Sequence, residues 1–447
     1  MKEALEMTDL NTKEHKISRG AYIAEAALEY FISIMITGAY LTNLLNDIGF
    51  STAAQTVISA LVTMTFSAEL FSVLLISKRS AVKRWVTVWN FFNQLLFALM
   101  YFTPFFKIPS GLKSTVFLSL LILGSLVEHA ICPFKTTWHM SNVENGKRGV
   151  FTAKKEIVSL IGGVIFSFVM GKIIDTYEDA GNITGSFIAG GITIIGLAIL
   201  HLISMCTIKE NNIETGFEKK PFIEGLKYSL KVTILDKSYR KIIVVFVLYF
   251  TAIASTYSFG AFQRNTLDFS MTFIALLTFL YSIVRSFFSV PFGKYADKHS
   301  WEKMLRICVI IAAIGFFINT FSTPSTGKIT YTIYFMIYAI SMAGINSGIL
   351  NLTFDYVKEE NRSVAIGWKS AIGGLAGFLT SCIESVFIEK LEQNDNILFG
   401  MKIYPQQVLS FISSVILVIL AIYLYTVVRK QKIVIENKEV YKNGKHT

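Results

Sequence analysis

Two glutamates, Glu25 and Glu29, stand four residues apart inside the first long apolar segment of this chain. Ionisable side chains are costly in a lipid bilayer, so their presence in such a segment indicates function. Further polar residues follow at helical spacing: Ser33, Thr37, Tyr40, Asn43 and, just past the segment, Asp47. On a helix all of them would lie within about 120° of arc. We therefore expect this face to point into a cavity or a helix bundle.

A carboxyl group in an apolar environment holds a proton more readily than it does in water. Glu29 lies nearer the middle of the segment than Glu25, so it is the predicted proton carrier or cation partner. Two carboxyls on one face also couple each other's titration. The alternatives are an interfacial Glu25 and a neutral Glu29 that forms only a structural hydrogen bond.

Arg285 lies inside the eighth apolar segment, and its guanidinium needs an anion because it cannot lose its charge. The candidate partners are Glu29, Glu69 and Glu128. Such a pair would latch the two halves of the chain together, unless it is a static ion pair. His129 lies next to Glu128 and could relay protons near neutral pH, or it could be an ordinary packing residue.

The elements that position these side chains are predicted to be membrane-spanning helices. The chain is 53% hydrophobic with a mean hydropathy of +0.52, well above a soluble domain. Twelve apolar segments are each long enough to cross a hydrocarbon core of roughly 30 Å. They cover residues 20–44, 52–77, 85–106, 114–134, 155–175, 186–206, 241–263, 269–291, 304–322, 329–350, 364–388 and 405–428. Strands are a poor alternative, because an open sheet cannot satisfy its edge groups in lipid.

The net charge of +11 is distributed as a topology signal rather than as a nucleic-acid surface. With these segments, 34 of the 42 Lys and Arg residues lie on the side of the N-terminus and seven on the opposite side. Positive residues stay in the cytoplasm, so we expect both termini there and no nucleic-acid partner. The first 19 residues are polar, and no signal peptide is expected.

The chain also repeats itself. Val143, Arg148, Val150 and Lys155 recur at an offset of 214 residues as Val357, Arg362, Val364 and Lys369, each set just before an apolar segment. Phe71-Ser-Val73 is echoed by Phe288-Ser-Val290 at nearly the same offset. Two related halves are a known plan of membrane transporters, with the substrate site between the halves.

This repeat predicts five parts. They are a cytoplasmic tail (1–19), a six-helix bundle (20–206), a cytoplasmic linker (207–240), a second six-helix bundle (241–428) and a second cytoplasmic tail (429–447). Within the linker, apolar residues at four-residue spacing predict an amphipathic helix on the membrane surface: Phe222, Leu226, Leu230 and Ile234.

An enzyme, a metal site and a cofactor are not expected. The four cysteines have neither metal-ligand nor disulfide-framework spacing: Cys132, Cys206, Cys308 and Cys382. A polytopic membrane enzyme would need a catalytic cluster on its loops. The sequence has no nucleophile elbow and no phosphate-binding glycine loop.

The loop after the eighth segment reads Gly293-Lys-Tyr-Ala-Asp297-Lys298. It resembles the loop signature of the major facilitator superfamily, and the Arg148-Gly149 loop resembles another recurrent element of that family. The resemblance implies an all-α polytopic membrane protein with twelve transmembrane helices in two pseudo-symmetric six-helix bundles. The loop after the second segment, Ser77 to Arg84, lacks the glycine and aspartate of the signature.

The resemblance also implies a gate. Asp297, in a tight loop with Gly293 and Lys298, is expected to face the cytoplasmic start of a helix in the other half, where exposed amides would stabilise it. Arg148 and Arg362 occupy the two equivalent loops and are predicted to take part. The alternative is an ordinary solvated turn.

In this superfamily the first, fourth, seventh and tenth helices line the cavity. The C-terminal half would contribute Tyr249 and Thr256 from the seventh segment and Tyr338, Ser341 and Asn346 from the tenth. Acids facing aromatic and hydroxyl groups suit a small polar or cationic organic solute. Neighbouring Tyr331 and Tyr334 are equally consistent with aromatic packing.

We therefore predict a secondary active transporter that works by alternating access and is coupled to protons or sodium. A sugar symporter and a lipid or lysolipid flippase on the same scaffold are the alternatives. The composition, rich in Lys, Ile and Asn, favours the plasma (inner) membrane of a bacterium, and we expect a monomer.

Overall fold

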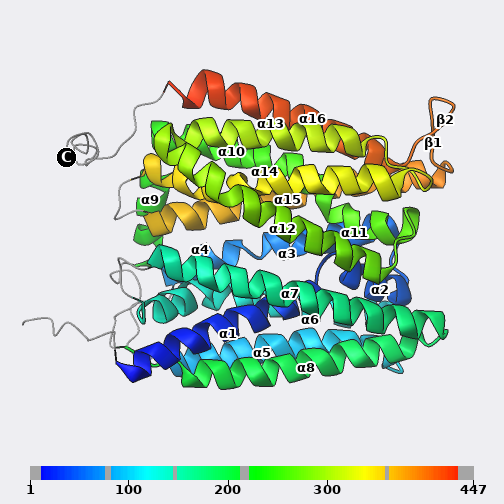
Figure 1. Cartoon of the computed structure of the whole chain (residues 1–447), viewed down its shortest axis with the longest axis horizontal. Coiled ribbons are helices and arrows are strands. Elements are labelled where there is room, and N and C mark those ends of the chain that lie inside the picture. Colours follow the sequence, from blue (N-terminus) through cyan, green and yellow to red (C-terminus); the bar gives the residue numbers. More distant parts are fainter. Residues whose placement is uncertain (1–11, 76–81, 144–147, 212–220, 358–361, 431–447) are drawn as a thin grey trace, which may run out of the picture. The chain divides into compact units, whose positions relative to one another are not determined.

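The structure is a computed structural model that describes residues 12–75, 82–143, 148–211, 221–357 and 362–430. Long helices make up almost all of it (Figure 1). The helices up to the predicted linker are α1 (Lys13–Met35), α2 (Gly38–Ile48), α3 (Thr52–Met64), α4 (Ser67–Leu75), α5 (Val82–Phe102), η1 (Thr103–Phe105), α6 (Ser110–Met140), α7 (Arg148–Asp179) and α8 (Ile183–Thr207).

The second stretch starts with a short helix in the predicted linker and continues with long helices. Its elements are α9 (Phe222–Val232), α10 (Lys237–Ile253), η3 (Ala254–Ser258), α11 (Phe259–Ala261), η4 (Phe262–Thr266), α12 (Met271–Lys298), α13 (Trp301–Asn319), α14 (Gly327–Asp355), α15 (Arg362–Gln393), β1 (Ile397–Leu398), β2 (Met401–Lys402), α16 (Pro405–Tyr423) and η6 (Leu424–Val428). Helices α7 and α15 begin at the repeated arginines and are each 32 residues long.

Among the described residues, nine helices are long and apolar enough to cross a membrane, or ten if the bent pair α1 and α2 is one span. The predicted spans 85–106 and 304–322 coincide with helices α5 and α13, which are not among the nine. Polar residues interrupt both: Asn90, Asn93 and Gln94 in α5, and Glu302, Lys303 and Arg306 in α13. The multi-pass helical fold is confirmed, and the count of twelve spans stays a prediction.

The helix ends follow local chemistry. The side chain of Thr12 accepts a hydrogen bond from His15 N at the start of α1, and Asp236 caps α10 by accepting from Ser238 N and Tyr239 N. Gly38 adopts φ +55° at the break between α1 and α2, where the axis turns by 41°. Glycine is favoured there because it has no Cβ to clash in the left-handed region.

The chain divides into two compact units. Unit 1 contains residues Met1–Gly49, Phe71–Lys219 and Ser270–Ala275, and unit 2 contains Phe50–Leu70, Lys220–Phe269 and Leu276–Thr447. The residues of α3 and the first half of α4 therefore belong to unit 2, and the first turn of α12 belongs to unit 1. The five-part division proposed from the sequence stays a prediction.

In unit 1, α1 packs on α7 and α8, and α5 packs on α6 and α8. A cluster of buried apolar residues forms part of the core of this unit and includes Tyr22, Phe134 and Trp138. The first turn of α12 is fixed on α7, because Asp175 accepts hydrogen bonds from Met271 N and Thr272 N, both at 2.8 Å. The glycine of α7 opposite this turn, Gly171, leaves room: a Cβ there would lie 2.9 Å from Met271 O.

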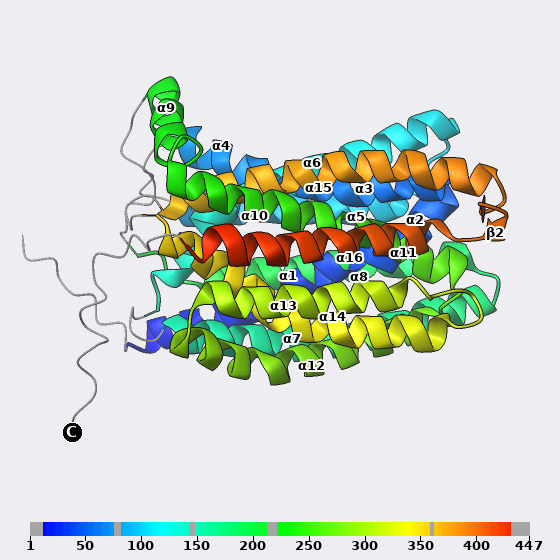
Figure 2. The same ribbon diagram turned by 90° about the horizontal axis from the view of Figure 1, so that it is seen from above.

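In unit 2, α3 packs on α15, and α13 packs on α14 and α16. The α3–α15 approach is close, since a Cβ on Gly374 would lie 2.1 Å from Thr63 O. Figure 2 shows α9 at one end of the long helices of its own unit and steeply inclined to them. Trp368 of α15 donates a hydrogen bond from Nε1 to Ser229 Oγ of α9 (3.2 Å).

One expectation about the loop signature is wrong. Residues 293–298 are not a loop but the last turns of α12, which ends at Lys298. A Cβ on Gly293 would meet no heavy atom within 4 Å, so the glycine is not required by a close approach of backbone. Helix α12 continues because its backbone can form regular hydrogen bonds through a glycine at modest cost.

Candidate functional site

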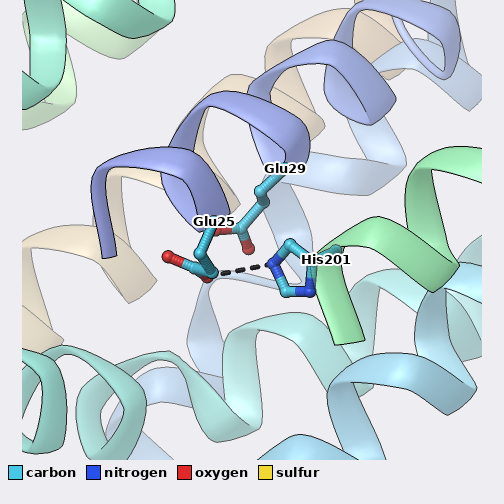
Figure 3. Close-up of side chains that lie close together, drawn as sticks. All are labelled: Glu25, Glu29 and His201. Carbon is cyan, nitrogen blue, oxygen red and sulfur yellow. Dashed lines mark hydrogen bonds and ion pairs between the residues drawn. The ribbon is translucent and has the colours of Figure 1, made fainter. Parts of the chain in front are cut away.

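Five ionisable side chains from three helices meet inside unit 1, and we call them the pentad. Helix α1 contributes Glu25 and Glu29, α6 contributes Lys135 and His139, and α8 contributes His201. Both pairs on one helix are four residues apart, which places their members on the same face. Figure 3 shows the two glutamates of α1 pointing toward His201.

Glu25 is the most enclosed member, with a side chain that is 1% exposed. Its Oε1 lies 3.0 Å from His201 Nε2 and 3.4 Å from Lys135 Nζ. Its Oε2 lies 3.6 Å from His139 Nδ1. Glu29 is 28% exposed, and Lys135 donates a short hydrogen bond to its Oε1. Lys135 therefore joins the two carboxylates, and it is itself only 8% exposed.

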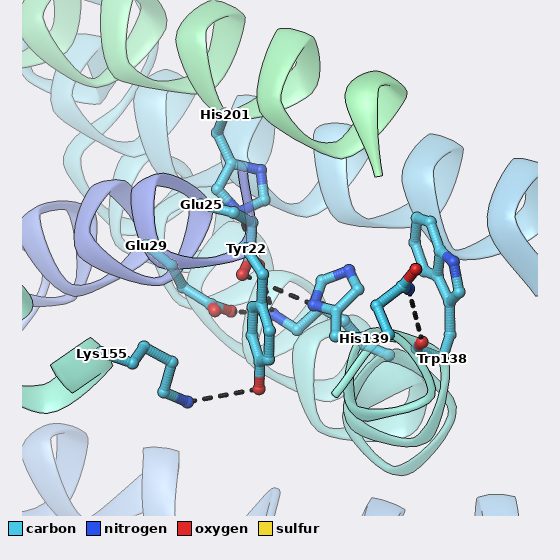
Figure 4. Close-up of polar contacts among 9 residues, drawn as sticks. Tyr22, Glu25, Glu29, Trp138, His139, Lys155 and His201 are labelled. Carbon is cyan, nitrogen blue, oxygen red and sulfur yellow. Dashed lines mark hydrogen bonds and ion pairs between the residues drawn. The ribbon is translucent and has the colours of Figure 1, made fainter. Parts of the chain in front are cut away.

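Two aromatic rings pack against His139 of the pentad (Figure 4). The ring of Tyr22 lies 4.6 Å from the His139 ring, and the ring of Trp138 lies 4.5 Å from it. Lys155 of α7 lies 3.3 Å from Tyr22 Oη and 4.9 Å from the centre of its ring. Lys155 thus adds a second positive charge at the edge of the site.

The charges of the pentad do not balance while both histidines are neutral. Two carboxylates and one ammonium leave a net charge of −1, and a buried uncompensated charge is strongly unfavourable. Both ring nitrogens of His139, as well as His201 Nδ1, have no hydrogen-bond partner in the described structure. One proton, on a histidine or a carboxyl, would make the pentad neutral.

A metal ion is a less direct fit. Ligand atoms of Glu25, Glu29 and His201 all lie within 4.8 Å of one another. Carboxylate and imidazole groups suit divalent transition metals. However, the Lys135 ammonium already pairs with both carboxylates, so a metal ion bound to all three residues would have to displace it from Glu25 as well as from Glu29.

Other residues predicted from the first segment lie elsewhere in unit 1. Tyr40 is buried and donates a hydrogen bond to Ser167 O (2.9 Å). Asn43 donates from Nδ2 to Glu178 Oε1 (2.9 Å). Glu128 lines a small pocket together with Glu29, and His129 follows it on α6 in a half-buried position.

The remaining predicted binding residues lie in unit 2. Arg285 is close enough to Tyr249 and Tyr338 for its charge to interact with their hydroxyl groups. Glu69 is likewise close enough to interact with the charge of Lys369. Tyr249 donates to Met342 Sδ (3.5 Å). The hydroxyls of Thr256 and Ser341 donate to backbone carbonyls of their own turns, and Asn346 is exposed. Tyr331 and Tyr334 are buried among rings, 6.0 and 5.6 Å from the Phe259 ring.

Of the predicted gating residues, Asp297 and Lys298 are exposed at the end of α12. Arg148 and Arg362 are the first residues of α7 and α15. Most of the basic segment Ser77 to Arg84 lies outside the described residues. The roles of these residues stay predictions.

Three members of the pentad were missed by the sequence analysis. The predicted segment 114–134 ends one residue before Lys135, which leaves Lys135 and His139 in the cytoplasmic loop that follows, but α6 continues to Met140. His201 is the one ionisable residue other than cysteine in the largely apolar helix α8. The available signal was the four-residue spacing of Lys135 and His139, which matches that of the glutamates.

This arrangement, a bundle of apolar helices around a buried ionic cluster, is that of a membrane transporter, and the comparisons with known proteins define the family. The profile of the Major Facilitator Superfamily matches residues 26–381 and 242–439, so the chain belongs to that family. No curated protein sequence matches the chain.

Several solved structures share the fold. A point mutant of the nucleoside transporter NupG superposes with a TM-score of 0.71 at 14% identity, covering 91% of this chain and 98% of its own. The xylose transporter XylE from E. coli gives 0.63 at 14% identity, covering 93% and 98%. An auto-inhibited peptide transporter of the POT family gives 0.69 at 9% identity, covering 96% and 99%. These structures support the fold, and membership of the Major Facilitator Superfamily makes the protein a multi-pass membrane transporter.

Proposed function

We propose that this protein is a secondary active transporter of a small polar or cationic organic solute, coupled to a proton or sodium gradient. The observation that carries the proposal is the pentad, a largely buried cluster of two carboxylates, one ammonium and two imidazoles whose net charge depends on whether it holds a further proton. A transporter coupled to a cation needs a site whose charge changes during the cycle, and ionisable residues within membrane helices are the usual means.

The coupling cation would be taken up by the pentad itself. A proton on His139, His201 or one of the carboxyls would neutralise the cluster and loosen the hold of Lys135 on the glutamates. The altered charge would change the relative stability of the two access states, since a ligand shifts a conformational equilibrium only through a difference in affinity. In this proposal the charge of the pentad biases the equilibrium between the two access states.

The solved proteins that share this fold are consistent with such a role. They include a nucleoside transporter, a D-xylose-proton symporter and a peptide transporter, and also a bacterial metal transporter. One of them is thus a proton symporter of a small polar solute. These proteins share 15% or less of their sequence with this chain, so the likeness extends only to the fold. The proposed function therefore depends on the chemistry of the pentad.

The test is transport by Glu29→Gln in proteoliposomes. The amide keeps the size of the side chain and can still accept from Lys135, but it carries no charge. We expect uptake driven by a proton gradient to fall more than tenfold, while exchange of substrate at equilibrium keeps most of its rate, because one proton step is lost. Glu178→Gln, whose carboxylate binds Asn43 away from the pentad, is the matched control.

Equal losses in driven uptake and in exchange would instead assign Glu29 to substrate binding. Driven uptake that is unchanged in Glu29→Gln would contradict the role of the pentad in coupling. Transport of lysolipids, with no transport of polar solutes, would replace the proposal with a flippase.

A further inference from the structure

Glu29 faces a small pocket as well as the pentad. The pocket lies within unit 1 between α1, α5 and α6. It is lined by Glu29, Ile32, Ser33, Ile36, Asn93, Gln94, Phe97 and Glu128. Its free volume is about 10 Å³, which is room for about one water molecule or one ammonium group.

Two side chains of α5 present unpaired acceptors here. Asn93 and Gln94 are each 2% exposed, and Asn93 Oδ1 and Gln94 Oε1 have no hydrogen-bond partner in the described structure. Buried amide oxygens without a partner are unfavourable and uncommon in folded proteins. A donor that enters the pocket, from a water molecule or from a ligand, would complete their hydrogen bonding.

The lining also favours positive charge. Two of its residues are glutamates, and no Lys, Arg or His is among the described residues that line it. Phe97 adds an aromatic ring, and the face of a ring attracts a cation. Ile32 and Ile36 make part of the wall apolar, which suits an organic ammonium better than a sodium ion that takes oxygen ligands on all sides.

We propose that this pocket binds the primary ammonium group of the transported solute. Its N–H groups would donate to Asn93 Oδ1, Gln94 Oε1 and the Glu29 carboxylate. This inference rests on the proposed function and narrows the substrate class to primary amines. It also adds Asn93 and Gln94 to the binding residues.

Glu29 then connects substrate to coupling, because it pairs with Lys135 on the side of the pentad and with the ligand in the pocket. An incoming ammonium would replace the Lys135 ammonium on Glu29. Lys135 would keep Glu25, whose Oε1 lies 3.4 Å from its Nζ. One ammonium thus exchanges for another, and no buried carboxylate is left without a cation.

The test compares ethanolamine with choline on the purified full-length protein, by isothermal titration at equal ionic strength. Both carry one positive charge and the same hydroxyethyl arm, but choline has no N–H donor. Hydrogen bonds from a charged donor correspond to roughly a tenfold or greater difference in affinity, so we expect ethanolamine to bind at least tenfold more tightly. Asn93→Leu and Gln94→Leu should each remove most of this difference.

Asn90→Leu is the matched control. Asn90 lies one turn before on α5, is 1% exposed and has no partner for either side-chain polar atom in the described structure, but it does not line the pocket. It should leave the preference for ethanolamine unchanged. The thermal midpoint of each unliganded variant reports folding, and replacing an unpaired buried amide by Leu is not expected to lower it.

Three results would overturn the inference. Equal affinities for ethanolamine and choline would remove the hydrogen-bond requirement. Binding of sodium chloride alone, lost in Asn93→Leu, would make the pocket a site for the coupling ion. Failure of ethanolamine to bind, while proteoliposomes accumulate a neutral solute in a gradient-dependent manner, would reject the ammonium site and leave the proposed transport function standing.

Discussion

At the scale of single residues, Lys135 is the centre of the ionic cluster, because it is the one member that contacts both glutamates. Removing one partner of a buried ion pair typically costs about 3–5 kcal/mol, since the other charge stays buried without compensation. The pentad is therefore expected to be sensitive to the loss of this single ammonium.

We predict that Lys135→Ala lowers the free energy of unfolding by about 3–5 kcal/mol, measured by denaturant titration in detergent. The chain offers a matched control in Lys209, which forms an exposed pair with Glu14 at 2.5 Å, with side chains 41% and 69% exposed. Exposed pairs contribute about 0–1 kcal/mol, so Lys209→Ala should have little effect.

A second substitution separates charge from packing. Adding Glu25→Gln to Lys135→Ala removes the more buried of the two carboxylates left without Lys135 and should restore part of the lost stability. Additive losses in the double variant would show that Lys135 stabilises the fold by packing alone, and would argue against an ionic pentad.

The sequence identified the acidic half of this site but not its basic half. Glu25 and Glu29 are conspicuous because a charge inside an apolar run is rare. Lys135 lies at the boundary of its run, where a charge is expected in water, and only the extension of α6 to Met140 brings it inside. Asn93 and Gln94 gave no signal, since neutral amides occur in many membrane helices and the pocket forms from three segments distant in sequence.

At the scale of elements, the first turn of α12 depends on α7. Asp175 accepts from two backbone N–H groups of that turn and from Thr272 Oγ1 (2.5 Å), so it acts as a helix cap supplied by another helix. Carboxylates near a helix N-terminus satisfy exposed amides and complement the helix dipole.

Asp175→Ala is expected to destabilise this turn by about 1–2 kcal/mol and to increase hydrogen exchange at the amides of Met271 and Thr272 by roughly tenfold. Mass spectrometry of peptides covering α12 measures this directly. The control is Asp179→Ala at the exposed end of α7, which should leave the exchange of α12 unchanged. Unchanged protection in Asp175→Ala would mean that other contacts hold the turn.

Hydrophobic patterning was enough to predict most of the helices. It failed at the end of α12, where it did not predict how far the helix continues. The signature Gly293 to Lys298 was expected to form a loop, yet α12 continues through it because none of these residues is a strong helix breaker except the glycine. The polar positions of α5 and α13 lower their hydropathy, so the helices are present but the apolarity typical of a span is not.

At the scale of the whole molecule, the distribution of Lys and Arg predicts that both termini are cytoplasmic. A green fluorescent protein fused after Thr447 should therefore fluoresce, whereas a periplasmic alkaline phosphatase fused at the same place should be inactive. The opposite pattern would reverse the orientation. Fusions at Ala180, in the short connection between α7 and α8, should give the reverse result and serve as the control.

The burial of Glu25 has a consequence for the synthesis of the protein. Helix α1 emerges from the ribosome before α6 and α8, and the partners of its glutamates follow 106 residues later at Lys135 and 176 residues later at His201. At about 5–20 residues per second, the interval to His201 is roughly 9–35 s. During that time α1 would present two acids with no counter-charge from α6 or α8. Until the later helices arrive, α1 is expected to insert with its two carboxyls protonated, and both can ionise once Lys135 is in place.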